Sequence, residues 1–154
     1  MEAHVGQVDE DGGDYYLHLL VPLADAARPY GAHAEMAGVM HRVIEDTREH
    51  PDVTRRYDAD RLRALEVPEE VVRAIEAVTR CPGERYLGGV IQRSASDRLG
   101  RLIALLNNKQ DLDRTLELAA TDPARARSLR EGRYLPARRI LLNAEAADGP
   151  RILA

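Results

Sequence analysis

The chain of 154 residues contains no phenylalanine and no tryptophan, and it has a single cysteine and a single lysine. Its core must therefore be built from Leu, Ile, Val, Ala and Met, a composition that suits helices packed on helices. Cys81 alone cannot form an internal disulfide, which fits a reducing compartment. No apolar run approaches the roughly 20 residues of a membrane-spanning helix, and residues 1–7 lack the basic and apolar regions of a signal peptide. We therefore expect a soluble, cytoplasmic protein with no membrane partner.

A strong excess of charge of either sign is also missing. The chain has 26 acidic and 22 basic residues, for a formal net charge of −4. A nucleic-acid-binding protein needs a basic stripe or patch that contacts phosphates, and no such stripe is present. We therefore expect no nucleic-acid partner. Lys109 is the only lysine, so nearly all the cations are arginines.

Helical periodicity dominates the chain, and no segment alternates as a strand does, so the sequence predicts an all-α bundle. The expected helices are 15–28 with a disturbance at Pro22, 33–46, a short one from Asp58 or Asp60 to Glu66, 68–80, a weak one over 86–94, 96–107, 122–130, and 136–147. The polar segments 9–14 and 47–57 are expected to be loops. A chain of this length fits one domain, which we place at 1–147, followed by a frayed tail over 148–154.

The densest group of ionisable side chains is His41-Arg42-Val43-Ile44-Glu45-Asp46-Thr47. On a helix His41 lies above Glu45, and Arg42 lies above Asp46, so the polar side chains gather on one side. The apolar residues around this segment predict a mostly buried helix that brings His41 inside. Two carboxylates beside an imidazole are typical of general acid–base chemistry. We therefore expect His41, Glu45 and Asp46 to be catalytic.

Several motifs in order across 3–139 resemble those of the HD-domain phosphohydrolases. They are Ala3-His4-Val5-Gly6-Gln7 followed by Gly12-Gly13, Tyr15 and His18; the 41–47 motif; 71–80 followed by Pro82-Gly83-Glu84 and Tyr86; and 103–107 followed by Gln110-Asp111-Leu112-Asp113. Within that superfamily the chain is most similar to small stand-alone relatives of the guanosine tetra/pentaphosphate hydrolase domain. The resemblance implies an HD-domain-like helical bundle.

The resemblance also implies one divalent metal, held at the positions of His18, His41, Arg42 and Asn107. Two of the family's ligands are carboxylates, and here they are a guanidinium and an amide, a change of three charge units. Arginine has no acceptor atom and stays protonated, so it cannot be a ligand. A guanidinium about 4 Å from a dication costs roughly 8 kcal/mol at an effective dielectric of 20. We therefore expect no metal and no cofactor at this site.

Two further departures bear on the ligand. Basic residues that would meet substrate phosphates in the family are Glu10 and Ala104 here, which argues against a highly charged nucleotide. We instead expect Arg42 to occupy the metal position and to hold an oxygen atom of a small polar or anionic molecule with its forked donors. His18 and Asn107 are expected to join it as ligand-binding residues.

Simpler explanations of the same residues stay open. Arg42 and Asp46 are spaced i, i+4, and an ordinary helical ion pair worth a few tenths of a kcal/mol would account for both. His18 and His41 could be packing histidines, or could join Asp46 and a further carboxylate around zinc. Cys81 has no neighbouring base in sequence and is not expected to be a nucleophile.

The sequence is compatible with three functions. One is a metal-independent acid–base enzyme of biosynthesis, and the second is a non-catalytic sensor or interaction protein of the same fold. The third, a residual metal-dependent phosphohydrolase, is supported by the family resemblance alone and is the least favoured. A homodimer stays open.

Overall fold

The computed structural model describes residues 14–149, which are helices joined by turns and short loops. The π-helical turns are η2 (Tyr16–Leu20), η5 (Tyr86–Val90) and η6 (Arg130–Tyr134), and the 3-10 turns are η3 (Arg28–Tyr30) and η4 (Val53–Arg55). The α-helices are α1 (Val21–Ala27), α2 (Ala32–Met40), α3 (Val43–Thr47), α4 (Ala59–Ala64), α5 (Glu69–Val78), α6 (Ile91–Ser96), α7 (Arg98–Leu118), α8 (Pro123–Leu129) and α9 (Leu135–Asp148). No strand occurs over 14–149, and the all-α prediction is confirmed. None of the helices described is long and apolar enough to span a membrane.

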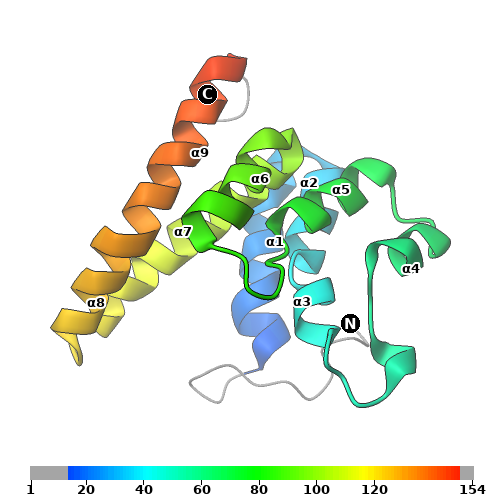
Figure 1. The fold of residues 1–154 in the computed structure, drawn as a ribbon, viewed down its shortest axis with the longest axis horizontal. Helices are drawn as coiled ribbons and strands as arrows, with labels where there is room; N and C mark the ends of the chain where they lie inside the picture. The colour runs from blue at the N-terminus through cyan, green and yellow to red at the C-terminus, as the bar shows by residue number, and fades with distance from the viewer. Residues whose placement is uncertain (1–13, 150–154) are drawn as a thin grey trace.

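Helix α7 is the element around which the others pack. It contacts α1, α2 and α5 on one side and α6 and α9 on the other, and α8, η6 and α9 run back beside it (Figure 1). Its start is as predicted, because the Asp97 carboxylate accepts the Gly100 N–H at 2.7 Å. The predicted end near Asn107 is wrong. Asn108 is buried, its side-chain amide nitrogen donates to the Tyr134 carbonyl at 2.9 Å, and the helix continues to Leu118.

The predicted helix over 33–46 is interrupted at His41 and Arg42. Helix α2 ends at Met40 and α3 begins at Val43, while Arg42 has φ −106° and ψ −2°. His41 Nδ1 lies 2.7 Å from the Gly38 carbonyl oxygen, which a continuous helix would use to bind the N–H of residue 42. This side-chain contact therefore accompanies the break that sets the direction of Arg42.

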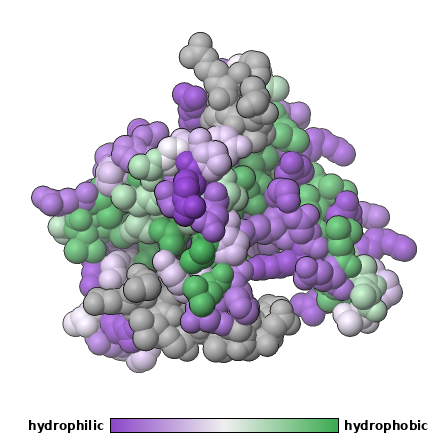
Figure 2. Space-filling view, turned by 180° about the vertical axis from the view of Figure 1, so that it is seen from behind, coloured by the Kyte–Doolittle hydropathy of each residue, from purple (hydrophilic) through white to green (hydrophobic). Residues whose placement is uncertain are grey.

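Two hydrophobic clusters share α7. The first is built mainly from α1, α2, α5 and the N-terminal half of α7, and includes Leu23, Val71 and Ile103. The second joins η5, α6, α7 and α9, and includes Val90 and Leu141. On the face that Figure 2 shows, hydrophobic side chains form separate areas among hydrophilic ones and do not make a continuous apolar belt.

The C-terminal end of α9 is anchored by a buried ion pair. Arg101 is 2% exposed, and its Nε donates to Glu145 at 2.9 Å while Nη2 donates to Asp148. Asp148 was predicted to begin a frayed tail, but it belongs to α9 and holds Arg101. Residues 150–154 and the expected loop and motif residues before Asp14, including Glu10, lie outside the described residues.

Other helix starts follow the local sequence closely. The helix over 15–28 is disturbed at Pro22 as expected, since a π-helical turn precedes α1 there. Asp58 and Asp122 accept backbone N–H groups at the starts of α4 and α8. Pro68 precedes α5 with an extended ψ of 136°, so it caps the helix and is not its first residue.

Candidate functional site

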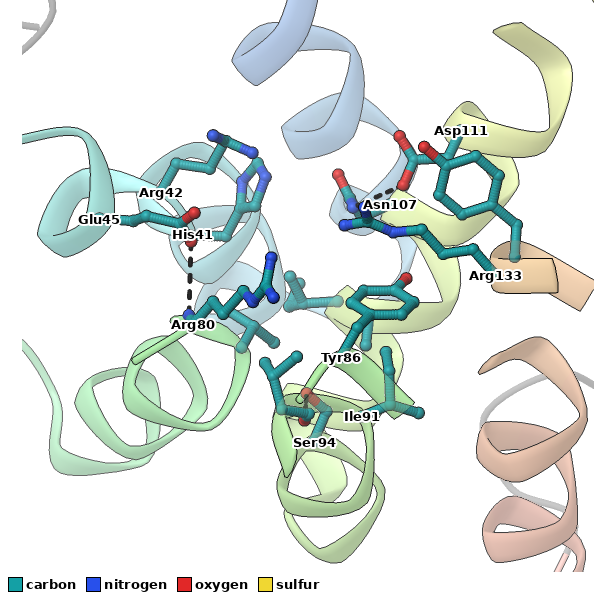
Figure 3. A pocket seen from close by; sticks show the side chains of 15 residues that line it. His41, Arg42, Glu45, Arg80, Tyr86, Ile91, Ser94, Asn107, Asp111 and Arg133 are labelled. Atoms are coloured by element: carbon teal, nitrogen blue, oxygen red, sulfur yellow. Dashed lines mark hydrogen bonds between the residues drawn. The ribbon is translucent and has the colours of Figure 1, made fainter. Parts of the chain in front are cut away.

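A cavity of about 240 Å³ lies where the two hydrophobic clusters meet against α7. Its wall contains four of the residues that the sequence predicted for the site: His41, Arg42, Glu45 and Asn107. The side chains reach it from the α2–α3 break, from the segment after α5, from η5 and η6, and from α7 (Figure 3). The structure therefore brings together residues that are more than 60 positions apart in sequence.

His41 is 5% exposed and occupies the break between α2 and α3. Its Nδ1 lies 2.7 Å from the Gly38 carbonyl oxygen, which can only accept a hydrogen bond. Nδ1 must therefore carry a proton, and in the neutral imidazole this leaves Nε2 as the basic nitrogen. Such a ring can accept a proton or a hydrogen bond through Nε2.

Arg42 lines the cavity and is held from behind by Asp46. Its Nε lies 3.3 and 3.4 Å from the two Asp46 oxygens, and Nη2 lies 3.2 Å from Oδ1. The Tyr15 hydroxyl donates to Asp46 Oδ2 at 2.7 Å. Burial raises the pKa of Tyr15, and the hydrogen bond to Asp46 adds to this effect. Burial lowers the pKa of Arg42, but the charges of Asp46, Tyr15 and Glu45 and the hydrogen bond to Asp46 together outweigh it, so the pKa is raised and the guanidinium stays charged.

The remaining predicted residues have different surroundings. Asp46 does not belong to the cavity wall, and its carboxylate is bound to Tyr15 and Arg42. His18 lies on η2 with an exposed side chain and is not part of the wall either. The backbone N–H of Arg80 donates to Glu45 Oε2 at 3.4 Å. Of the three residues expected to be catalytic, only His41 and Glu45 face the cavity.

Sequence reasoning missed two arginines of the wall, Arg80 and Arg133. Arg80 donates through Nε and Nη2 to the Glu84 carbonyl at 3.2 and 3.0 Å. The Glu84 carboxylate is in turn held by Arg93, which fixes this turn. In Figure 3 the guanidinium groups of Arg80 and Arg133 point toward each other from opposite sides of the cavity.

Arg133 reaches the cavity from η6 and lies over the Tyr86 ring, with its guanidinium carbon 4.1 Å from the ring centroid. The Arg133 Nε atom is buried and has no hydrogen-bond partner among residues 14–149. A buried donor without an acceptor costs about 1 to 3 kcal/mol. Arg133 therefore carries an unsatisfied donor beside the cavity.

Asp111 completes the polar part of the wall, one helical turn beyond Asn107. The Asn107 amide donates to Asp111 Oδ2 at 3.3 Å. Burial raises the pKa of Asp111, although Arg114, Arg133 and Arg42 act in the opposite direction. Burial also raises the pKa of Tyr86, with the nearby Asp111 charge as a further cause. Asp111 is therefore easier to protonate than an exposed aspartate.

The site offers few ligands to a cation. Three guanidinium groups (Arg42, Arg80 and Arg133) face two carboxylates (Glu45 and Asp111), and no group of three His, Cys, Asp or Glu side chains over 14–149 has an arrangement that could hold a metal ion. The same wall suits an anion, because guanidinium donors form strong charge-assisted hydrogen bonds to carboxylate or phosphate oxygens.

Comparisons with known proteins add no further assignment, because no protein-family model matches this chain and no curated protein is significantly similar to it.

Proposed function

We propose that the chain is a degenerate HD-domain protein whose cavity binds a small anionic molecule, with Arg42 at the position that the resemblance assigns to the metal. The main support is the convergence of Arg42, Arg80 and Arg133 on one cavity. Arg80 is exposed and Arg42 and Arg133 are half-buried, so solvent screens part of their mutual repulsion, and anionic groups nearby relieve the rest. Asp46 pairs with Arg42, Glu45 and Asp111 offset part of the remaining positive charge, and a bound anion would add to this neutralisation.

The size of the cavity limits the ligand. A volume of about 240 Å³ corresponds to roughly eight water molecules at about 30 Å³ each. Most pockets for drug-sized ligands are larger, at about 300 to 1,000 Å³. This supports a molecule of roughly ten non-hydrogen atoms over a nucleotide with several phosphates.

In the enzyme that we favour, His41 and Glu45 transfer protons to and from this bound molecule without a metal. His41 and Glu45 both line the cavity, where an imidazole and a carboxylate can act as a proton acceptor and donor toward a bound molecule. Asp46 acts through Arg42 as a positioning residue. The alternative of a non-catalytic sensor is supported by the contacts of Asp46. Its carboxylate is bound to Tyr15 and Arg42, so one of the expected acid–base groups is not available to a ligand in the cavity.

Anion binding is tested by titrating the protein with acetate, hexanoate, sulfate and phosphate at low ionic strength, using calorimetry. We expect at least one of these anions to bind, and Arg42→Gln to weaken that binding about tenfold or more, as loss of a charged hydrogen bond should. The matched control is Arg85→Gln, at an exposed arginine outside the cavity wall. Absence of binding by all four anions, or equal effects of the two variants, would refute the proposal.

The relation to the HD-domain family has its own test. The double variant Arg42→Asp, Asn107→Asp restores the two carboxylates that the resemblance assigns to metal binding. We expect it to bind manganese, detected by electron paramagnetic resonance, whereas Arg85→Asp should not. If the double variant folds and binds no manganese, the alignment of these positions with the family is wrong.

A further inference from the structure

The cavity has two chemically different ends. Its polar end carries the guanidinium groups, while elsewhere five apolar side chains line the wall beside Tyr86, Ser94 and Tyr134: Val78, Val90, Ile91, Ile103 and Ala104. In Figure 3 Ile91 and Tyr86 lie across the cavity from His41 and Arg42. An inorganic anion would use only the polar end. A ligand that fills the cavity must therefore also carry an apolar part.

The charges of the wall indicate how much negative charge the ligand carries. The three guanidinium groups and two carboxylates of the wall itself leave about one positive charge, which Asp46, bonded to Arg42 from outside the wall, reduces. A monoanion matches this charge. A phosphate group carries about −1.5 to −2 at neutral pH and exceeds it.

Arg133 offers the donor that is best prepared for such a group. The Tyr86 ring covers one face of its guanidinium group, and this stacking holds the group in place. Its buried Nε has no acceptor among the described residues. A planar carboxylate can accept from two guanidinium N–H groups at once, which matches the fork of an arginine side chain.

From these observations we infer that the ligand class of the cavity is a small monocarboxylic acid with a short hydrocarbon chain. Its carboxylate lies among the guanidinium groups, with Arg133 as a main contact. Its chain lies against Val78, Ile91 and Ala104. This inference rests on the proposed function, because it specifies which anion the same cavity binds.

The test compares acetate, butyrate and hexanoate with phosphate, succinate and 1-hexanol, by calorimetry at low ionic strength. Each methylene buried should strengthen binding about fourfold, so affinity rises from acetate to hexanoate. Phosphate and succinate should bind at least about tenfold more weakly than hexanoate, because each brings an additional negative charge. 1-Hexanol should bind weakly, since it lacks the carboxylate.

Two variants locate the binding. Arg133→Gln should weaken hexanoate about tenfold or more, whereas Arg127→Gln, at an exposed arginine of α8, should leave it unchanged. Ala104→Val narrows the apolar end and should weaken hexanoate more than acetate. If Arg133→Gln fails to fold by circular dichroism, the chain-length series on the unmodified protein still decides the question.

The outcomes separate the inference from the proposal beneath it. The inference of a monocarboxylate ligand is wrong if phosphate or succinate binds as tightly as hexanoate, or if the affinity does not depend on chain length. Either result leaves the proposal of anion binding intact. Hexanol binding as tightly as hexanoate also overturns the inference. If none of the anions binds, both the inference and the proposed function are wrong.

Discussion

The role of Arg42 can be divided experimentally into an ion pair and a ligand contact. Arg42→Gln removes both, whereas Asp46→Asn removes the ion pair and keeps the guanidinium charge at the cavity. The double variant completes a thermodynamic cycle for the free energy of unfolding, and the same proteins are titrated with hexanoate. These four proteins therefore separate the two roles.

The strength of the ion pair follows from its geometry and exposure. Two unit charges about 4 Å apart interact by roughly 4 kcal/mol at an effective dielectric of 20, which is an upper limit here. The Arg42 side chain is 36% exposed and the Asp46 side chain is 11% exposed, so solvent screening reduces this value strongly. The N–O distances of 3.2 to 3.4 Å are also long for charged hydrogen bonds. We expect a coupling energy of about 1 kcal/mol, above the roughly 0.3 to 0.5 kcal/mol of an exposed helical pair.

Urea unfolding followed by circular dichroism gives the coupling energy, and calorimetry gives the affinity. Arg42→Gln should weaken hexanoate binding about tenfold or more. The affinity of Asp46→Asn for hexanoate should stay within about threefold of that of the unmodified protein, because the cavity keeps its cation and loses a nearby negative charge. Arg85→Gln serves as the control in both assays.

Two results would refute this reasoning. If Arg42→Gln binds hexanoate as well as the unmodified protein while the coupling energy persists, then Arg42 is only a structural ion pair. If the coupling energy lies below about 0.3 kcal/mol, then Asp46 does not position Arg42, even if Arg42 contacts the ligand.

Three other substitutions test the fold and the electrostatics of the cavity. Burial raises the pKa of Asp111 above its usual 3.8, so the ionised carboxylate destabilises the native state at higher pH. Asp111→Asn should therefore raise the melting temperature at neutral pH, and this gain should vanish below about pH 3.8. An equal gain at both pH values would contradict the assignment. Arg101→Met leaves Glu145 buried without its cation and should cost about 3 to 5 kcal/mol in urea unfolding; a loss below about 1 kcal/mol would show that the pair is not needed. Gly38→Ala places a Cβ about 3.0 Å from the Ala24 Cα and should cost about 1 to 3 kcal/mol by the same measurement, whereas no loss would show that α1 and α2 can separate.

Local sequence was enough to predict most helix starts, because capping depends on residues that are close in the chain. Asp58, Asp97 and Asp122 each accept a backbone N–H three residues later. The end of α7 could not be predicted in this way. It depends on the hydrogen bond of Asn108 to the Tyr134 carbonyl, 26 residues away. Without that partner, an asparagine pair after an apolar run indicates the end of a helix.

Four of the fifteen residues in the cavity wall could be anticipated from the sequence. His41, Arg42, Glu45 and Asn107 were predicted from motifs and lie in its wall. Arg80 and Arg133 were not predicted. The chain is so rich in arginine that no single one is conspicuous, and only the fold decides which of them converge. Asp111 stood inside the Gln110-Asp111-Leu112-Asp113 motif without being assigned a role.

The remaining wall residues had weaker signals of their own. Arg80 ends the 71–80 segment and Tyr86 ends the stretch after it, so both stood inside motifs without being assigned a role. Their importance comes from the turn between them, where Glu84 receives hydrogen bonds from Arg93 and its carbonyl accepts from Arg80. A turn of this kind is set by contacts between separate helices, and sequence spacing does not encode them.

A metal centre combines two properties, attraction for an anion and activation of a bound water. The proposed replacement of the metal by Arg42 separates them. A dication with two carboxylate ligands is formally neutral, whereas Arg42 with Asn107 carries about one positive charge, so attraction for an anion persists. A guanidinium whose pKa is raised cannot accept a lone pair or lower the pKa of a bound water as a metal ion does. The cavity would then keep anion binding and lose the activated water of a phosphohydrolase. It follows that the Arg42→Asp, Asn107→Asp variant should bind hexanoate more weakly than the unmodified protein without manganese, and should recover affinity when manganese is added.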